Sequence, residues 1–182
     1  EFRDGVGAAI EYARMLGCKR LNMISGIASP KYEEKTLRET YVSNLRFAAD
    51  ELGQAGIMLM LEPINTRSMP GMYLRYSGQA LSLIDQAAAP NAQLQYDLFH
   101  MQIMEGDLAK TIEAHLGRIG HMQVADVPDR HEPGTGEINF PFLFDLIDRL
   151  GYPGWIGAEY NPARGTLAGL GWARPWLHEP AQ

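Results

Sequence analysis

Short apolar runs alternate with amphipathic helical segments along this chain, and that alternation restricts the fold more than any other feature. The runs that we interpret as strands are residues 19–26, 56–63, 92–97, 118–126 and 154–160. Apolar residues recur at helical spacing in segments 6–16, 37–52, 77–87, 107–116 and 141–150. Strands that alternate with helices predict a parallel sheet with helices outside it. We expect Ser77 to cap the third helix, and the tail after residue 160 to be irregular.

Four polar residues lie at or near the points where predicted strands end, namely Glu62, Asp97, Gln123 and Glu159. Each is separated from the next by about one strand–helix unit of ~30 residues. The carboxyl ends of parallel strands meet on one face of the sheet, so these side chains are expected to converge there. Three carboxylates and one amide form an oxygen-only set that suits a hard divalent cation. The pattern therefore predicts a metal-dependent enzyme.

Each of these residues also has a simpler structural interpretation. Glu62 and Glu159 could each cap a turn or pair with an arginine. Asp97 could be a helix N-cap, and Gln123 could satisfy backbone groups. His121 competes with Gln123 as a metal ligand, but Gln123 is nearer the end of its strand. Two glutamates at one end of a sheet repel each other unless a cation lies between them, and this favours the metal interpretation for Glu62 and Glu159.

Two long loops follow the second and fourth predicted strands, at residues 63–76 and 126–139. They could be surface loops without function, but loops at this end of a parallel barrel commonly contact substrate. Arg67 and Arg130 could each hold a substrate carboxylate through two hydrogen bonds, and we favour Arg130. Asp126 is interpreted as structural.

Composition excludes several classes of function. The 182 residues suit one domain, residues 1–182, and the net charge of −6 without a basic cluster argues against binding nucleic acid or an anionic membrane. No apolar stretch approaches the ~20 residues that a membrane span needs. The single Cys18 excludes an internal disulfide and a thiolate metal cage. The first residues do not resemble a signal peptide, so we expect a cytoplasmic protein.

Several sequence words together resemble the hydroxypyruvate isomerase family of xylose-isomerase-like barrels. These words are LEPINT, QYDLFHMQ, HMQVAD, EPGTGEINFPFLF, and GWIGAEYNP followed by GLGW. The resemblance implies a (β/α)8 fold and a divalent metal, Mg²⁺ or Mn²⁺, held by Glu62, Asp97, Gln123 and Glu159. It also implies proton transfer by Glu62 and Glu159, and His100 is a candidate contact to a substrate oxygen. The expected reaction converts a small 2-keto acid, such as hydroxypyruvate, to tartronate semialdehyde through an enediolate.

The chain departs from that family in length. A barrel of this type has eight strands in ~250 residues, whereas we predict five and the chain opens on a helix. We therefore expect an incomplete barrel, the C-terminal portion of a longer one, with open edges that a second copy could cover. Three alternatives remain open: a sugar-ketose epimerase, a nuclease acting at abasic DNA sites through a histidine-rich zinc cluster, and a truncated, non-catalytic remnant.

Overall fold

The computed structural model describes residues 1–176 and contains one parallel sheet whose strands follow the order of the sequence. The strands are β1 (Arg20–Asn22), β2 (Met58–Leu61), β3 (Ala92–Asp97), β4 (Ile119–Val124) and β5 (Ile156–Ala158). All four neighbouring pairs are parallel. The predicted parallel direction is confirmed, and the sequential strand order is the one that the resemblance to a barrel implies. Strands β1 and β5 are shorter than the apolar runs that contain them.

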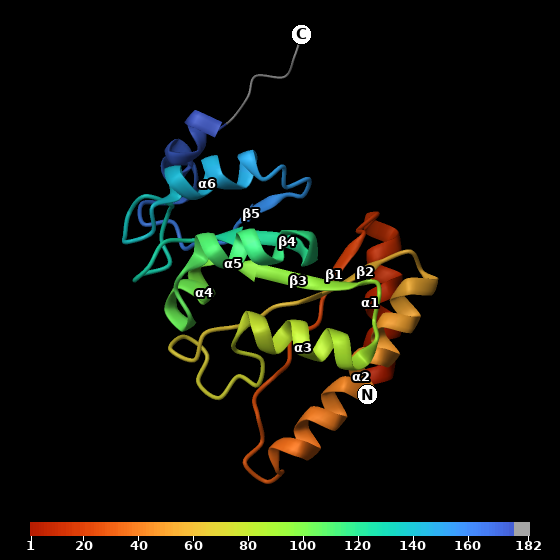
Figure 1. Ribbon diagram of the computed structural model, residues 1–182. Coiled ribbons are helices and arrows are strands. Elements are labelled where there is room, and N and C mark those ends of the chain that lie inside the picture. The colour runs from red at the N-terminus through yellow and green to blue at the C-terminus, as the bar shows by residue number, and fades with distance from the viewer. Residues whose placement is uncertain (177–182) are drawn as a thin grey trace.

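Helices connect the strands and lie outside the curled sheet (Figure 1). They are α1 (Phe2–Leu16), α2 (Glu34–Gln54), α3 (Ser77–Ala87), α4 (Leu98–Met104), α5 (Leu108–His115), α6 (Phe140–Arg149) and α7 (Thr166–Gly169), with 3₁₀ turns η1 (Leu116–Arg118) and η2 (Leu170–Trp176). Five parallel strands with outer helices form the incomplete barrel that the sequence predicts.

The hydrophobic core lies between the sheet and these helices. Val6, Ile10 and Ala13 of α1 are buried at helical spacing, as predicted, because they share the face that packs inward. Leu16 was expected to join them but is 79% exposed. It lies at the last position of α1, where the next residue, Gly17, turns the chain in a left-handed conformation.

Three other local predictions need correction. Tyr76, not Ser77, is the N-cap of α3, and Ser77 instead donates its backbone N–H to Glu105. Helix α4 follows β3 directly and was not predicted, because seven residues are too few to show helical periodicity. The tail predicted to be irregular forms α7 and η2. Trp172 stacks on Phe144 of α6, with ring centroids 6.2 Å apart.

The two edges of the sheet differ from its centre. Within the described residues, β1 pairs only with β2, and β5 pairs only with β4. Near the β5 edge, Trp155 is 79% exposed, and it lines a cavity of about 420 Å³ together with Asn22 and Gln95. The inner face of the sheet is therefore less covered than its outer face. No helix in residues 1–176 combines the length and apolar character of a membrane span.

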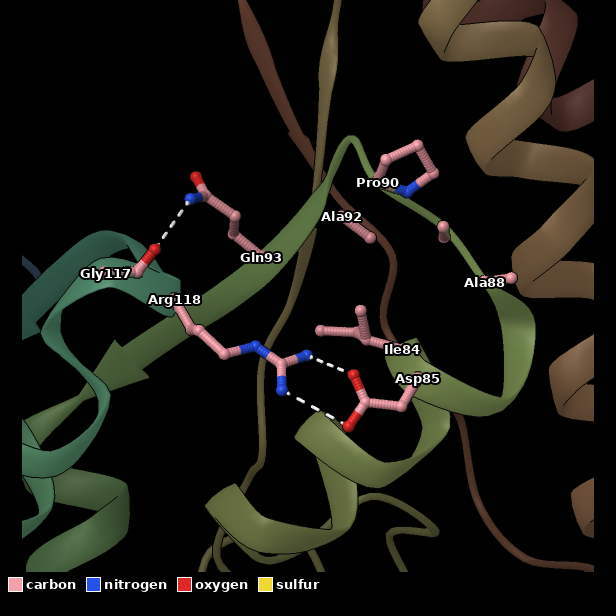
Figure 2. Close-up of a pocket in the computed structure, with 9 residues that line it drawn as sticks. Ile84, Asp85, Ala88, Pro90, Ala92, Gln93, Gly117 and Arg118 are labelled. Atoms are coloured by element: carbon pink, nitrogen blue, oxygen red, sulfur yellow. Dashed lines mark hydrogen bonds and ion pairs between the residues drawn. The ribbon is translucent and has the colours of Figure 1, made fainter.

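A larger groove, of about 580 Å³, lies at the amino end of β3, away from the strand ends that carry the predicted site (Figure 2). An ion pair between Arg118 and Asp85 crosses it, with N···O distances of 2.7 and 3.3 Å. The side chains of Arg118 and Asp85 are 40% and 64% exposed, so water screens the ion pair and it adds little to stability.

Replacing Leu94 with Ala is expected to lower the free energy of unfolding by about 3 kcal/mol. Leu94 lies in the middle of the sheet and is fully buried, so truncation leaves a cavity that the core cannot easily close. Urea unfolding measures the change. The matched control is Leu167→Ala, whose side chain is 87% exposed and which should change stability by less than about 0.5 kcal/mol. Equal effects of the two variants would contradict this packing.

Candidate functional site

The four residues expected at strand ends lie at the carboxyl ends of neighbouring strands. Asp97 is the last residue of β3 and pairs in register with Gln123, near the end of β4. Glu62 directly follows β2, where Pro63 cannot donate a further ladder hydrogen bond. Glu159 directly follows β5, and its backbone N–H still bonds to the carbonyl of β4's last residue.

A chain of side-chain amides connects three of these four residues. Gln95 of β3 donates its Nε2 to Glu62 Oε2 at 2.9 Å and to Gln123 Oε1 at 2.6 Å. Gln123 in turn donates its Nε2 to Glu159 Oε2 at 2.8 Å. Asn22, at the end of β1, donates to Glu62 Oε2 at 2.5 Å. Each strand of the sheet thus contributes to one polar network.

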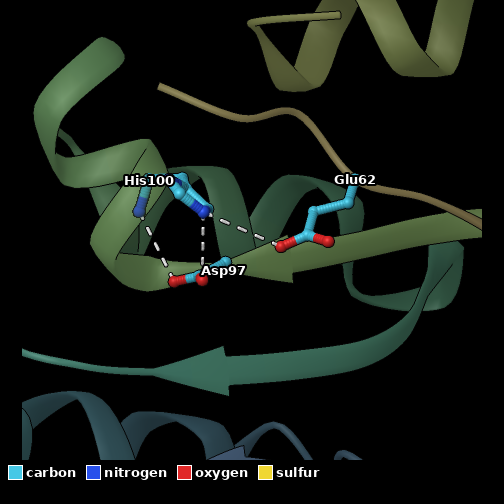
Figure 3. A group of neighbouring side chains, drawn as sticks. All are labelled: Glu62, Asp97 and His100. Carbon is cyan, nitrogen blue, oxygen red and sulfur yellow. Dashed lines mark hydrogen bonds and ion pairs between the residues drawn. The ribbon is translucent and has the colours of Figure 1, made fainter. Parts of the chain in front are cut away.

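Asp97 belongs to a second, buried group with Glu62 and His100 (Figure 3). One possible ligand atom from each of these residues lies within 4.8 Å of the others. Asp97 is also the N-cap of α4, because its Oδ1 accepts the backbone N–H of Phe99 at 2.8 Å. Its other oxygen, Oδ2, lies 3.6 Å from His100 Nε2. The N-cap and site interpretations of Asp97 are therefore compatible, since each uses a different oxygen.

His100 presents an N–H group to this cluster. The backbone N–H of Ser68 bonds to Asn65 Oδ1 at 2.7 Å, which fixes the orientation of the Asn65 amide. Asn65 Nδ2 consequently donates to His100 Nδ1 at 2.6 Å, so the ring proton of neutral His100 is on Nε2. That Nε2 faces Asp97 Oδ2 and, at 3.9 Å, Glu62 Oε1. In this tautomer His100 offers a hydrogen-bond donor and no free lone pair to bind a metal.

Burial sets the charge states of the cluster. It raises the pKa of Glu62 to about 7, with further contributions from the charges of Asp97 and Glu159. Burial also raises the pKa of Asp97 to about 6, against the opposing effect of Arg130. The pKa of His100 falls to about 3 because the ring is buried and lies near Arg130. The site therefore gathers carboxylates whose negative charge the surrounding side chains only partly compensate.

Arg130 is the cation that the loop between β4 and α6 brings to these carboxylates. Its guanidinium lies 2.9 Å from Glu159 Oε2 and 3.5 Å from Asp97 Oδ2. It also lies over the ring of Phe99, 5.0 Å from the centroid. Arg67, the other candidate, approaches Phe99 at 6.0 Å and donates to the carbonyl of Pro128. Arg130 therefore contacts the strand-end carboxylates, and Arg67 holds two loops together.

Sequence reasoning missed three residues of the site: Asn22 and Gln95 in the polar network, and Asn65 beside His100. Asn22 and Gln95 lie on predicted strands, and period-two spacing places Gln95 on the same side of β3 as Asp97. Nothing in the sequence pairs Asn65 with His100, because the contact depends on how the loop after β2 folds over α4. His121, the competing metal candidate, is half-buried farther from the strand ends and lies outside the Glu62–Asp97–His100 group.

In metal-free protein, Glu62→Gln is expected to raise the free energy of unfolding by up to about 3 kcal/mol at pH 8. The folded-state pKa of Glu62, about 7, is above its ordinary value of 4.5, so ionised Glu62 destabilises the folded protein at higher pH. The gain should shrink to less than about 1 kcal/mol at pH 5, because Glu62 is then protonated in the folded state.

Urea titrations with a chelator at both pH values test this expectation. Glu11→Gln, on the exposed side of α1, is the matched control and should have little effect at either pH. A gain for Glu62→Gln that is the same at pH 5 and pH 8 would contradict the buried, charge-repelled state of this carboxylate.

Comparison with known proteins identifies the relatives of this chain. A family model described as the xylose isomerase-like TIM barrel matches residues 1–176. A 2-oxo-tetronate isomerase of Cupriavidus necator is 44% identical over 97% of this chain and 68% of its own length. A hydroxypyruvate isomerase of Escherichia coli is 48% identical over the same shares.

A solved structure supports the same relationship. The crystal structure of a protein described as AP endonuclease, family 2, from Brucella melitensis has a TM-score of 0.93 and 45% identity. That match covers 96% of this chain and 67% of the Brucella chain. The chain therefore belongs to the xylose isomerase-like TIM barrel family.

Proposed function

We propose that this protein is an isomerase of a small 2-keto acid and that it converts hydroxypyruvate to tartronate semialdehyde. The main support for the proposal is that one hydrogen-bond network joins the carboxylates of Glu62 and Glu159 at the strand ends. Asp97 and Arg130 lie beside this network. The names of relatives that are 44% and 48% identical over nearly the whole chain support this class of reaction.

The residues of the site fit a divalent cation. Glu62, Asp97, Gln123 and Glu159 would hold it through oxygen atoms, which favours Mg²⁺ or Mn²⁺ over Zn²⁺. The raised pKa values of the buried Glu62 and Asp97 carboxylates reflect negative charge that a cation would neutralise. When bound, such an ion would polarise the substrate carbonyl and hydroxyl oxygens. The amide oxygen of Gln123 retains a second lone pair beside the one that Gln95 uses.

Glu62 and Glu159 are the proposed proton-transfer groups. In hydroxypyruvate, one glutamate removes a proton from the hydroxyl-bearing carbon, which leaves an enediolate shared with the neighbouring carbonyl. The hydroxyl proton passes to the former carbonyl oxygen, and the other glutamate delivers a proton to the former carbonyl carbon. The original hydroxyl carbon then becomes the aldehyde, and the former carbonyl carbon carries the hydroxyl group. The two carboxylates have different surroundings, because Glu62 is 5% exposed and the side chain of Glu159 is 53% exposed.

Two further residues would orient the substrate. Arg130 would hold the substrate carboxylate, because its guanidinium already binds carboxylate oxygens in the site. The Nε2–H of His100 would donate to a substrate oxygen, since Asn65 fixes the tautomer that carries this proton. Both groups bind without transferring a proton from the reacting carbons.

A 2-oxo-tetronate or a ketose is the second candidate substrate class, because one of the relatives is named 2-oxo-tetronate isomerase. Proton NMR of candidate substrates in deuterated water distinguishes isomerisation from epimerisation at one carbon. Cleavage of abasic DNA is disfavoured, since the chain has a net charge of −6 and the buried carboxylate group contains His100 as its one histidine. A non-catalytic remnant would bind no metal at these strand ends.

We further propose that a second copy of the chain covers the open edges at β1 and β5, because unpaired strands expose backbone donors and acceptors. The partners expected are thus a small keto acid or sugar and another copy of the chain, with no nucleic acid or membrane. The cytoplasmic location stays a prediction.

Glu62→Gln and Glu159→Gln should each lower kcat by at least about a hundredfold, because proton transfer contributes on the order of 10² to 10⁴. Both variants should still bind Mn²⁺, with weaker affinity, as seen by a rise in melting temperature on adding the ion. Adding a chelator to wild-type protein should remove both the turnover and that rise. Normal isomerisation by either variant would show that the proton-transfer assignment is wrong.

Arg130→Lys should raise KM for hydroxypyruvate about ten- to hundredfold and change kcat much less, because the carboxylate is held throughout the reaction. Arg67→Lys is the matched control. Arg67 also lies near the Phe99 ring, but its guanidinium donates to the backbone carbonyl of Pro128. Steady-state kinetics of both variants measure the difference. A larger KM effect for Arg67→Lys would reverse the assignment of the two arginines.

A further inference from the structure

The loop between β4 and α6 is built around one buried carboxylate, that of Asp126, which is 1% exposed. Its Oδ1 accepts the backbone N–H groups of Val127 at 2.9 Å and Ile138 at 3.1 Å. Its Oδ2 accepts those of Gly134 at 2.8 Å and Gly136 at 2.9 Å. Four backbone donors replace the water that an ionised carboxylate would otherwise need. Asp126 therefore determines how the whole loop is folded.

The residues around Asp126 are adapted to this arrangement. Gly134 has a φ of +89°, a conformation that favours glycine. A Cβ on Gly136 would collide with the carbonyl oxygen of Val127 and approach Asp126 Oδ1 within 2.8 Å. The two glycines allow the backbone to approach the carboxylate closely enough for all four bonds.

Arg130, a residue of this loop, has an uncommon backbone conformation. Its φ is +60°, in the left-handed region, which is unfavourable for a residue with a side chain. Two hydrogen bonds hold it there: Arg130 N donates to the carbonyl of Asp126 at 2.9 Å, and Asn161 N donates to the carbonyl of Arg130 at 2.7 Å. Strain of this kind persists where the surrounding structure enforces it, and often at functional sites.

Glu132 joins the same loop to the segment that carries Glu159. It is 6% exposed, and both of its carboxylate oxygens lie 3.2 Å from the backbone nitrogen of Ala163. His131 Nδ1 lies 2.7 Å from the carbonyl oxygen of Asn161, which adds a second link. These contacts fix the position of the loop relative to the segment that follows β5.

We propose that Asp126, assisted by Glu132, is a positioning residue that holds Arg130 where it can bind the carboxylate of the substrate. This inference rests on the proposed function, in which Arg130 makes that contact. Asp126 does not touch the substrate. It acts through the loop backbone, whose left-handed turn at Arg130 directs the guanidinium to Glu159 and Asp97.

Asp126→Asn removes one of the two carboxylate oxygens and places an amide NH₂ against backbone donors, so it should release the loop. We expect KM for hydroxypyruvate to rise about tenfold or more, with kcat changed by less than about threefold, as for Arg130→Lys. In the double variant Asp126→Asn/Arg130→Lys, the KM effects should not multiply, because both substitutions remove one contact. Glu137→Gln, which loses an exposed carboxylate in the same loop, is the control and should leave KM unchanged.

Hydrogen exchange provides a readout that does not depend on activity. In Asp126→Asn, backbone amides of residues 134–138 should exchange at least about tenfold faster, whereas those of α6 should be unchanged. If Asp126→Asn does not fold, Glu132→Gln tests the same positioning of Arg130 by the loop. This variant should raise KM about three- to tenfold without lowering kcat.

The outcomes separate the two proposals. A raised KM in Arg130→Lys with a normal KM in Asp126→Asn and Glu132→Gln would overturn the positioning role and leave the proposed function intact. Normal KM in all three variants would refute the carboxylate contact of Arg130, and the positioning role with it. Faster exchange throughout α6 and the sheet, with multiplying effects in the double variant, would show that Asp126 only stabilises the fold.

Discussion

Electrostatic repulsion among carboxylates at the ends of neighbouring parallel strands is the constraint on which this site depends. Glu62 and Asp97 are both buried, and the pKa of each is raised, so the fold holds negative charge where it costs free energy. The neighbouring side chains all stabilise this negative charge. Asn22 and Gln95 donate hydrogen bonds to Glu62, and the guanidinium of Arg130 lies near Asp97. A site arranged in this way is suited to receive a cation.

The strands and the loops have different roles in the site. The strands place oxygen atoms and amides, because their pairing register brings residues such as Asp97 and Gln123 side by side. The loops position the groups that would contact substrate. The loop between β4 and α6 carries Arg130, and Asn65 in the loop after β2 orients His100 of α4. Phe99 lies close to the guanidinium groups of both Arg67 and Arg130. This division is typical of parallel α/β proteins, in which a rigid sheet carries variable loops.

The two faces of the curled sheet differ in how well other parts of the chain cover them. Helices cover the outer face and make a continuous core with it, whereas the inner face and the edges at β1 and β5 remain open in the described residues. The proposed ligand residues all come from β2 to β5 and their ends. Asn22 of β1 completes the polar network around them at one edge of the sheet.

From its apolar periodicity, which is a local property, the sequence predicts the parallel sheet and the candidate residues at the strand ends, and the family resemblance adds the barrel-like strand order. It could not predict that Gln95 bridges Glu62 and Gln123, or that Asn65 sets the tautomer of His100, because those contacts join residues about thirty positions apart. The left-handed turn at Arg130 likewise follows from a loop folded around Asp126. These features depend on the tertiary structure, because strand register and loop packing fix the hydrogen-bond partners, and no short stretch of sequence encodes either.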